Sequence, residues 1–158
     1  MTLLSVEHIT KNFAAPGGRF RRRGTPVRAV ADISFSLAPG GKLGIVGESG
    51  SGKTTLGRIA LGLLRPDEGR VLCDGRDVHA AAGPARRALR REMQMIFQDN
   101  AGALDPRLSI GEAVAEPLRV HGLGANERER RGIVLRWLER VGLDATLYGR
   151  RPHELSGG

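Results

Sequence analysis

The feature that most limits how this chain can fold is a glycine-rich loop between two apolar segments. Lys42-Leu43-Gly44-Ile45-Val46 is short and apolar, as a buried strand would be, and apolar residues recur at helical spacing from Leu56 to Leu64. Between them lie eight residues that fit the pattern G-x-x-x-x-G-K-[ST]: Gly47, Glu48, Ser49, Gly50, Ser51, Gly52, Lys53 and Thr54. The sequence therefore predicts a strand, a tight loop and a helix in succession.

A loop of this kind suits the phosphates of a nucleoside triphosphate. Its glycines allow the backbone to curl, so that successive N–H groups converge on an anion at a helix N-terminus. Lys53 offers a compact charge to the β- and γ-phosphate oxygens, and the Thr54 hydroxyl can ligate Mg²⁺. Lys53 is also one of only three lysines in a chain with 22 arginines. We therefore expect ATP with Mg²⁺, the alternative being a flexible Gly/Ser-rich turn that binds nothing.

The bulk composition narrows the classes of partner. The net charge is +8, yet aromatic residues are only 4% of the chain, so platforms for stacking nucleic-acid bases are scarce. We expect no nucleic-acid partner, and the basic residues to form solvated faces or to lie near anionic lipid. The cluster Arg19–Arg23 is expected to be a solvated hairpin tip, with lipid or partner contact as the alternative.

The lone Cys73 excludes an internal disulfide, and no signal sequence is evident, so cytosol is the expected compartment.

The remaining segments indicate an α/β protein with two parts. Alternation, turn signals and helical spacing predict strands at 3–9 and 27–37, a type I′ hairpin around Asp74-Gly75, and a helix at 86–91. Met93–Phe97 is expected to be a second buried strand. Helices are predicted at 109–121 and 126–141, the second with Asn126 and Glu129 as a capping pair and Gly142 as its stop. We divide the chain into a strand-rich part, residues 1–103, and a helical part, residues 104–158.

Three further segments resemble the ATPases of ABC transporters. Met95-Ile96-Phe97-Gln98-Asp99 resembles their Q-loop, and Leu155-Ser156-Gly157-Gly158 resembles the start of their LSGGQ signature. Phe13 stands where that family places an aromatic ring against adenine. The segments Glu116-Pro117-Leu118 and Pro152–Gly158 are similar to the ATP-binding subunits of oligopeptide, dipeptide and nickel importers.

The resemblance implies a fold and a set of site residues. The fold would be a P-loop NTPase core, RecA-like with an N-terminal antiparallel β part, plus an α-helical subdomain, both incomplete at the C-terminus. The metal would be held by Thr54 and Gln98, and the signature residues Leu155, Ser156, Gly157 and Gly158 would face the ATP of a partner subunit. The nucleotide-binding residues would be Phe13, Gly47, Glu48, Ser49, Gly50, Ser51, Gly52, Lys53, Thr54, Thr55 and Gln98.

The resemblance also implies partners, and it leaves alternatives open. Two such subunits, identical or different, would sandwich ATP and drive permease subunits at the inner face of the cell membrane, importing peptides or a similar solute. The family's catalytic glutamate and switch histidine would lie beyond Gly158, so no catalytic residue is expected within the chain. The alternatives are a nucleotide-binding remnant without turnover and an ABC ATPase outside transport. Each motif residue taken alone also has an ordinary structural explanation. Phe13 could be a core residue, Gln98 a surface residue, and Ser156-Gly157-Gly158 a common loop sequence.

Overall fold

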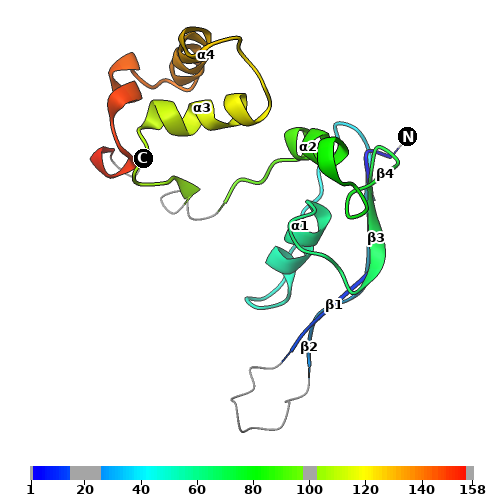
Figure 1. Cartoon of the computed structure of the whole chain (residues 1–158). Helices are drawn as coiled ribbons and strands as arrows, with labels where there is room; N and C mark the ends of the chain where they lie inside the picture. The colour runs from blue at the N-terminus through cyan, green and yellow to red at the C-terminus, as the bar shows by residue number, and fades with distance from the viewer. Residues whose placement is uncertain (1, 15–25, 98–102, 156–158) are drawn as a thin grey trace, which may run out of the picture. The chain divides into compact units, whose positions relative to one another are not determined.

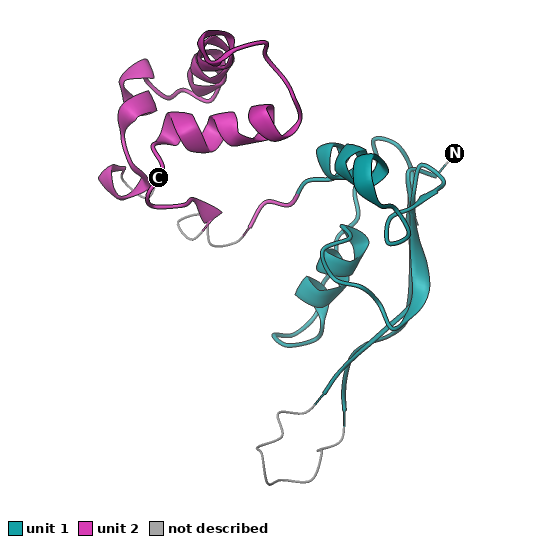
Figure 2. Cartoon of the chain, viewed as in Figure 1, with its two compact units in different colours: residues 1–94 teal, residues 95–158 magenta. Residues whose placement is uncertain are grey.

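The computed structural model describes residues 2–14, 26–97 and 103–155. Contacts divide the chain into a first unit, Met1–Gln94, and a second unit, Met95–Gly158 (Figure 2). The sequence placed the boundary after residue 103. Because residues 98–102 lie outside the described ranges, that boundary stays a prediction.

The first unit is built on a four-stranded sheet whose neighbouring strands all run antiparallel. Its strands are β1 (Leu4–Phe13), β2 (Val27–Leu37), β3 (Glu68–Cys73) and β4 (Arg76–Asp77), in the order β2-β1-β3-β4. The ladder between β1 and β2 runs from the pair Leu4 and Leu37 to the pair Phe13 and Val27. The first two predicted strands are therefore confirmed, and β1 continues beyond its predicted end.

Two glycines fix the path of β3. Gly69 has φ = +85°, and a Cβ there would lie 2.3 Å from the carbonyl oxygen of Glu7, so only glycine allows β1 and β3 to approach this closely. At the other end of β3, Asp74 (φ = +49°) and Gly75 (φ = +73°) are both left-handed. Two left-handed central residues define a type I′ turn, which confirms the predicted hairpin.

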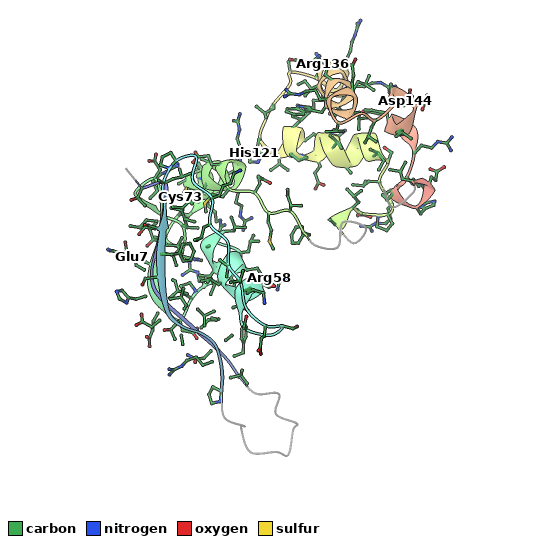
Figure 3. All side chains as sticks on the ribbon, turned by 180° about the vertical axis from the view of Figure 1, so that it is seen from behind. Glu7, Arg58, Cys73, His121, Arg136 and Asp144 are labelled. Atoms are coloured by element: carbon green, nitrogen blue, oxygen red, sulfur yellow. The ribbon has the colours of Figure 1, made fainter. Side chains whose placement is uncertain are left out.

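Two helices, α1 (Lys53–Ala60) and α2 (Gly83–Glu92), pack on the same face of this sheet (Figure 1). Cys73, labelled in Figure 3, belongs to the buried core. The other buried members of the core are Val6, Ile9, Val30, Leu56, Ile59, Ala60, Val71, Val78 and Leu89. The sheet and the two helices thus share one hydrophobic core.

Helix α1 ends earlier than the sequence predicted. The helical spacing of apolar residues continues to Leu64, but Gly62 is left-handed at φ = +69°. The Leu63 N–H donates to the Arg58 carbonyl and the Gly62 N–H to the Ile59 carbonyl. These two bonds form a Schellman motif, which satisfies the last carbonyls of the helix and stops it.

The two apolar runs expected as buried strands form no strand in the described structure. Neither Leu43–Val46 nor Met95–Phe97 pairs with a neighbouring strand within residues 26–97 and 103–155. Val46 is 93% exposed and Ile96 is 91% exposed. An apolar run becomes a strand only where a neighbour takes up its N–H and C=O groups, so this prediction is wrong for the structure as described.

The second unit consists of helices. They are α3 (Ile110–Val120), α4 (Glu127–Arg140) and the 3₁₀ turns η2 (Ala145–Gly149) and η3 (Pro152–Glu154). Ser109 and Glu112 cap α3 reciprocally, and the Asn126 side chain accepts from the Glu129 N–H at the start of α4. The Glu129 carboxylate accepts from the Ala125 N–H, one residue before the expected position. Gly142, at φ = +76°, follows the end of α4 as predicted.

The apolar face of α4 divides between core and surface. Val134 and Leu138 are buried with Ile110 and Ala115 of α3, whereas Trp137 is 51% exposed and Val141 is 66% exposed. Helical periodicity places Trp137 and Val141 on the same side of α4 as the buried pair. Since α3 covers only part of the width of α4, these two side chains remain outside the core. No helix in the described residues is long and apolar enough to cross a membrane.

Candidate phosphate-binding loop

The loop from Gly47 to Thr54 is held against strand β2. Gly52 has φ = +91°, and a Cβ at this position would lie 2.0 Å from the backbone oxygen of Ala29 in β2. The Ser51 N–H donates to the Glu48 carbonyl at 3.2 Å, which closes the loop, and the Leu56 N–H donates to the Gly52 carbonyl at 2.8 Å, which starts α1. The glycine pattern thus positions the loop by close backbone contact.

Lys53 lies across this loop. Its Nζ donates to the carbonyl oxygens of Gly47 at 2.8 Å and Glu48 at 2.6 Å, and it lies 3.4 Å from the Ser51 hydroxyl. The ammonium is thus held at the loop. A phosphate oxygen arriving at the loop would meet this charge without any large movement of the backbone.

The N-terminus of α1 has no side-chain cap among the described residues. Its N-cap, Gly52, makes no side-chain hydrogen bond, and the first turn has no acidic residue. By contrast, α3 and α4 have side-chain caps at Ser109 and Asn126, and glutamates in their first turns. Uncapped N–H groups at the positive end of a helix dipole favour an anion. This end of α1, with Thr54 and Thr55 in its first turn, can therefore bind phosphate.

A cavity of 380 Å³ opens beside the loop. This volume is within the range of ligand pockets in proteins. Loop residues and apolar side chains of the first unit form most of its wall, and Arg28 and Lys53 contribute the charges. The lining residues are Arg28, Ala29, Val30, Ala31, Ile33, Ile45, Val46, Gly47, Ser51, Gly52, Lys53 and Leu56. The contribution of β2 to this wall was not predicted, because it depends on contacts distant in sequence.

Phe13 is at the end of β1, opposite Val27 in the ladder. Its side chain is 42% exposed, and the Lys11 Nζ lies 5.9 Å from the ring centroid. Phe13 is not among the residues lining the cavity. Its contact with adenine stays a prediction, as does the alternative that it serves the core.

Asp67 is a positioning residue that the sequence did not single out. Its carboxylate accepts from the Lys11 Nζ at 2.7 Å and from the Asn12 N–H at 2.7 Å. These hydrogen bonds hold the pKa of the Asp67 carboxyl below its usual range, and the bond from Lys11 has the largest effect. Asp67 therefore ties the segment between α1 and β3 to the end of β1 that carries Phe13. The only local signal was a turn residue after Pro66.

His79 joins the far end of α1 to the chain after β4. Its Nε2 lies 2.9 Å from the Ile59 carbonyl oxygen, in the last turn of α1, and the His79 carbonyl accepts from the Arg65 guanidinium at 3.0 Å. These contacts fix the helix that carries Lys53 and Thr54 at its other end.

The other predicted site residues mostly lie outside the described structure. Gln98 and the signature residues Ser156, Gly157 and Gly158 fall in undescribed segments, so their roles stay predictions. Leu155 is described, and it packs against the apolar core of the second unit.

Comparison with known proteins decides the family. The family model described as ABC transporter matches residues 30–158. The chain belongs to the ABC transporter family. The match includes the loop, α1, and the predicted Q-loop and signature segments, so the resemblance inferred from the motifs is confirmed.

Similar relatives in this family include ATP-binding proteins of importers. The chain is 42% identical over 157 residues to "Glutathione import ATP-binding protein GsiA" of Salmonella paratyphi A, covering 99% of this chain and 25% of that protein. It is 41% identical over 158 residues to "Oligopeptide transport ATP-binding protein AppF" of Bacillus subtilis, covering 99% of this chain and 48% of that protein. The chain thus spans a quarter to a half of these relatives.

Solved structures support the fold. The ATP-binding cassette MJ0796, solved as a dimer in a post-hydrolysis state bound to ADP and Pi, matches with a TM-score of 0.76 and 26% identity. The match covers 98% of this chain and 63% of the cassette chain. The predicted P-loop NTPase class is therefore confirmed.

Proposed function

We propose that this chain is an ATP-binding portion of an ABC importer subunit, and that it binds ATP with Mg²⁺ at the loop from Gly47 to Thr54. The observation that carries the proposal is the uncapped N-terminus of α1, which is preceded by Gly52 in close contact with β2 and lies beside the Lys53 ammonium. This arrangement offers N–H donors and a positive charge at one place.

The donor set suits a triphosphate with its metal. Backbone N–H groups of the first turn and Lys53 would bind phosphate oxygens, and the Thr54 hydroxyl is a hard oxygen ligand of the kind Mg²⁺ prefers. Bound Mg²⁺ would neutralise part of the phosphate charge. Gln98 is the second proposed metal residue, and Phe13 would stack on adenine.

We expect nucleotide binding without rapid hydrolysis from these 158 residues. Hydrolysis requires a residue that orients or deprotonates the attacking water, and none of the 158 residues is assigned that role.

The proposed cargo and partners rest on the relatives and on the resemblance to importer ATPases. Those relatives serve import of glutathione or oligopeptides, so we propose a peptide or similar small solute as cargo. A second ATPase subunit would face the segment Leu155–Gly158, and permease subunits would hold the assembly at the inner face of the membrane. The dimeric cassette MJ0796 supports pairing of ATPase subunits.

The binding step is tested by titrating the 158-residue chain with Mg·ATP. A charge-assisted contact from Lys53 is worth roughly 1.5–3 kcal/mol, so Lys53→Ala should weaken binding about 10- to 100-fold. Lys42→Ala is the matched control, because Lys42 lies outside the loop and should bind as the parent does. An unchanged dissociation constant in Lys53→Ala would disprove the site.

A further inference from the structure

Helix α2 presents a compact face of four arginines. Arg86, Arg87, Arg90 and Arg91 are all exposed, and their spacing places them within an arc of about 140° around the helix. Leu89 lies outside that arc and is buried at 4% exposure in the core of the first unit. One apolar side chain therefore anchors the helix, and the arginines face outward. We call these four residues the α2 arginine face.

The α2 arginine face has no carboxylate partner among the described residues. The one acidic residue of the helix, Glu92, forms its ion pair with Arg76, which lies in β4. Arg86 and Arg90, like Arg87 and Arg91, are four residues apart, and like charges at this spacing destabilise a helix. Arg90 and Arg91 lie in the last turn, where positive charge favours the helix dipole, but Arg86 and Arg87 lie outside that turn and only add to the repulsion.

Other features show that α2 is not built for its own stability. Its N-cap, Ala82, makes no side-chain hydrogen bond, and its first turn has no acidic residue. Helices α3 and α4, by contrast, each have a side-chain cap and an acidic residue in the first turn. Departures from local stability rules are expected mainly at functional positions. This contrast within one chain argues against an ordinary solvated face.

The net positive charge of the chain is concentrated in the unit that contains α2. Residues 1–94 contain 16 basic and 8 acidic side chains, whereas residues 95–158 contain nine of each. The entire net charge of +8 therefore lies in the first unit, and α2 contributes the four arginines of its face to it. A long-range attraction to an anionic surface would act on this unit alone.

We propose that the α2 arginine face binds an anionic phospholipid surface. Apart from the arginines, Leu89 and Glu92, the helix consists of glycine, proline and alanine, so it offers no aromatic ring for stacking on a base and no large apolar group for a protein pocket. Recognition is therefore by charge and by guanidinium forks that match phosphate. A basic cluster on an amphipathic helix is a known signature of binding to anionic lipid. The inference rests on these charges and not on nucleotide binding.

The test is co-sedimentation of the 158-residue chain with vesicles. The chain should bind vesicles of phosphatidylcholine with about one-third phosphatidylglycerol, bind vesicles of pure phosphatidylcholine far less, and be released by salt. Each arginine near such a surface should raise the binding constant about fivefold, so Arg86→Gln with Arg90→Gln should lower it roughly 25-fold.

Matched variants separate this from general effects of charge. Arg128→Gln with Arg136→Gln removes the same charge from the exposed surface of α4 (Arg136 is labelled in Figure 3) and should leave vesicle binding unchanged. Arg86→Lys with Arg90→Lys keeps the charge and should keep most of the binding, even if the glutamine variant folds poorly. Mg·ATP affinity should be the same in all of them, so this proposal and the nucleotide site can fail separately.

Three outcomes would overturn the proposal. These are equal binding to both kinds of vesicle, equal loss from the α4 control, and vesicle binding retained by the α2 glutamine variant. Stronger binding to an RNA homopolymer or an acidic polypeptide than to anionic vesicles at the same salt would also overturn it, and would assign the face to that partner.

Discussion

The backbone oxygen of Ala29 occupies the space that a side chain on Gly52 would need. A Cβ on Gly52 would lie 2.0 Å from that oxygen, closer than any two such atoms can pack. The contact joins strand β2 to the loop across 23 residues of sequence. It therefore decides where the loop is held and where α1 begins.

Gly52→Ala should displace the loop from β2 and weaken Mg·ATP binding. Gly50→Ala is the matched control, since Gly50 is also left-handed (φ = +80°) but a Cβ there meets nothing within 4 Å. Both changes incur a left-handed strain of roughly 1–2 kcal/mol, and only Gly52→Ala adds the clash. Calorimetric titration with ATP and thermal unfolding measure the difference. Equal losses in the two variants would show that the contact with Ala29 does not position the loop.

Phe13→Ala should weaken ATP binding and leave the preference for triphosphate over diphosphate intact. The physical reason is that the ring is expected to contact adenine, whereas the phosphates are bound by the loop. The half-exposed ring at the end of β1 makes this substitution tolerable for folding. Fluorescent-nucleotide titrations with ATP and ADP measure the effect. If the variant instead loses structure by circular dichroism, and loses ATP and ADP binding together, the result would support a core role for Phe13.

Asp67→Asn should lower the melting temperature at neutral pH. The hydrogen bonds from Lys11 and Asn12 lower the pKa of Asp67 in the folded state, so the carboxylate stabilises the fold above its unfolded pKa near 3.8. This contribution is lost as the pH falls through the lower, folded pKa. The parent and the variant should therefore converge in acid.

Asp74→Asn is the control for that experiment. Asp74 is at the left-handed first central position of the hairpin turn, where asparagine is well tolerated, and its side chain forms no ion pair or hydrogen bond among the described residues. Its melting profile should follow that of the parent at every pH. A constant difference between Asp67→Asn and the parent down to the most acidic pH would contradict the role of the carboxylate.

Glu127→Gln should destabilise the second unit in a manner sensitive to pH and salt. Hydrogen bonds from Arg119 and then Arg130 lower the pKa of Glu127 to about 2, against 4.5 in its usual state. The stabilisation is complete above the unfolded value and is lost as the pH falls through about 2. Because the pair is exposed, salt should reduce the effect.

The matched change is Glu139→Gln, in the last turn of the same helix. Glu139 makes no ion pair among the described residues, and a negative charge near a helix C-terminus is unfavourable, so its removal should not destabilise the unit. Far-ultraviolet circular dichroism during acid and thermal unfolding distinguishes the two. If Glu127→Gln and Glu139→Gln lose similar stability, the effect comes from the change in net charge and not from the ion pairs of Glu127.

The features predicted well from the sequence are those decided within a few residues. The type I′ turn follows from Asp74-Gly75 alone, and the cap of α4 follows from Asn126 followed by Glu129. The end of α1 carries such a signal too, because Gly62 alone suits the left-handed position of the Schellman motif, although the apolar spacing continues past it to Leu64.

The features predicted poorly depend on partners distant in sequence. Hydrophobicity marks Leu43–Val46 as suited to burial, but it does not say which strand would lie beside it, and none does in the described structure. The bond between Lys11 and Asp67 joins residues 56 apart, and neither has a pattern that points to the other. At the candidate site, the loop was evident from its motif, whereas its seat on β2 was not.

The Lys53 contacts also give the chain an unusual response to amine-reactive chemistry. In acylation the amine nitrogen attacks the reagent, and the two carbonyl oxygens that contact the Lys53 Nζ restrict the approach of a reagent to it. Of the three lysines, Lys11 is held by Asp67 and Lys53 by its own loop, while Lys42 is exposed. The three lysines thus report separately on the contact between β1 and Asp67, on the loop and on an exposed reference position, without any engineered label.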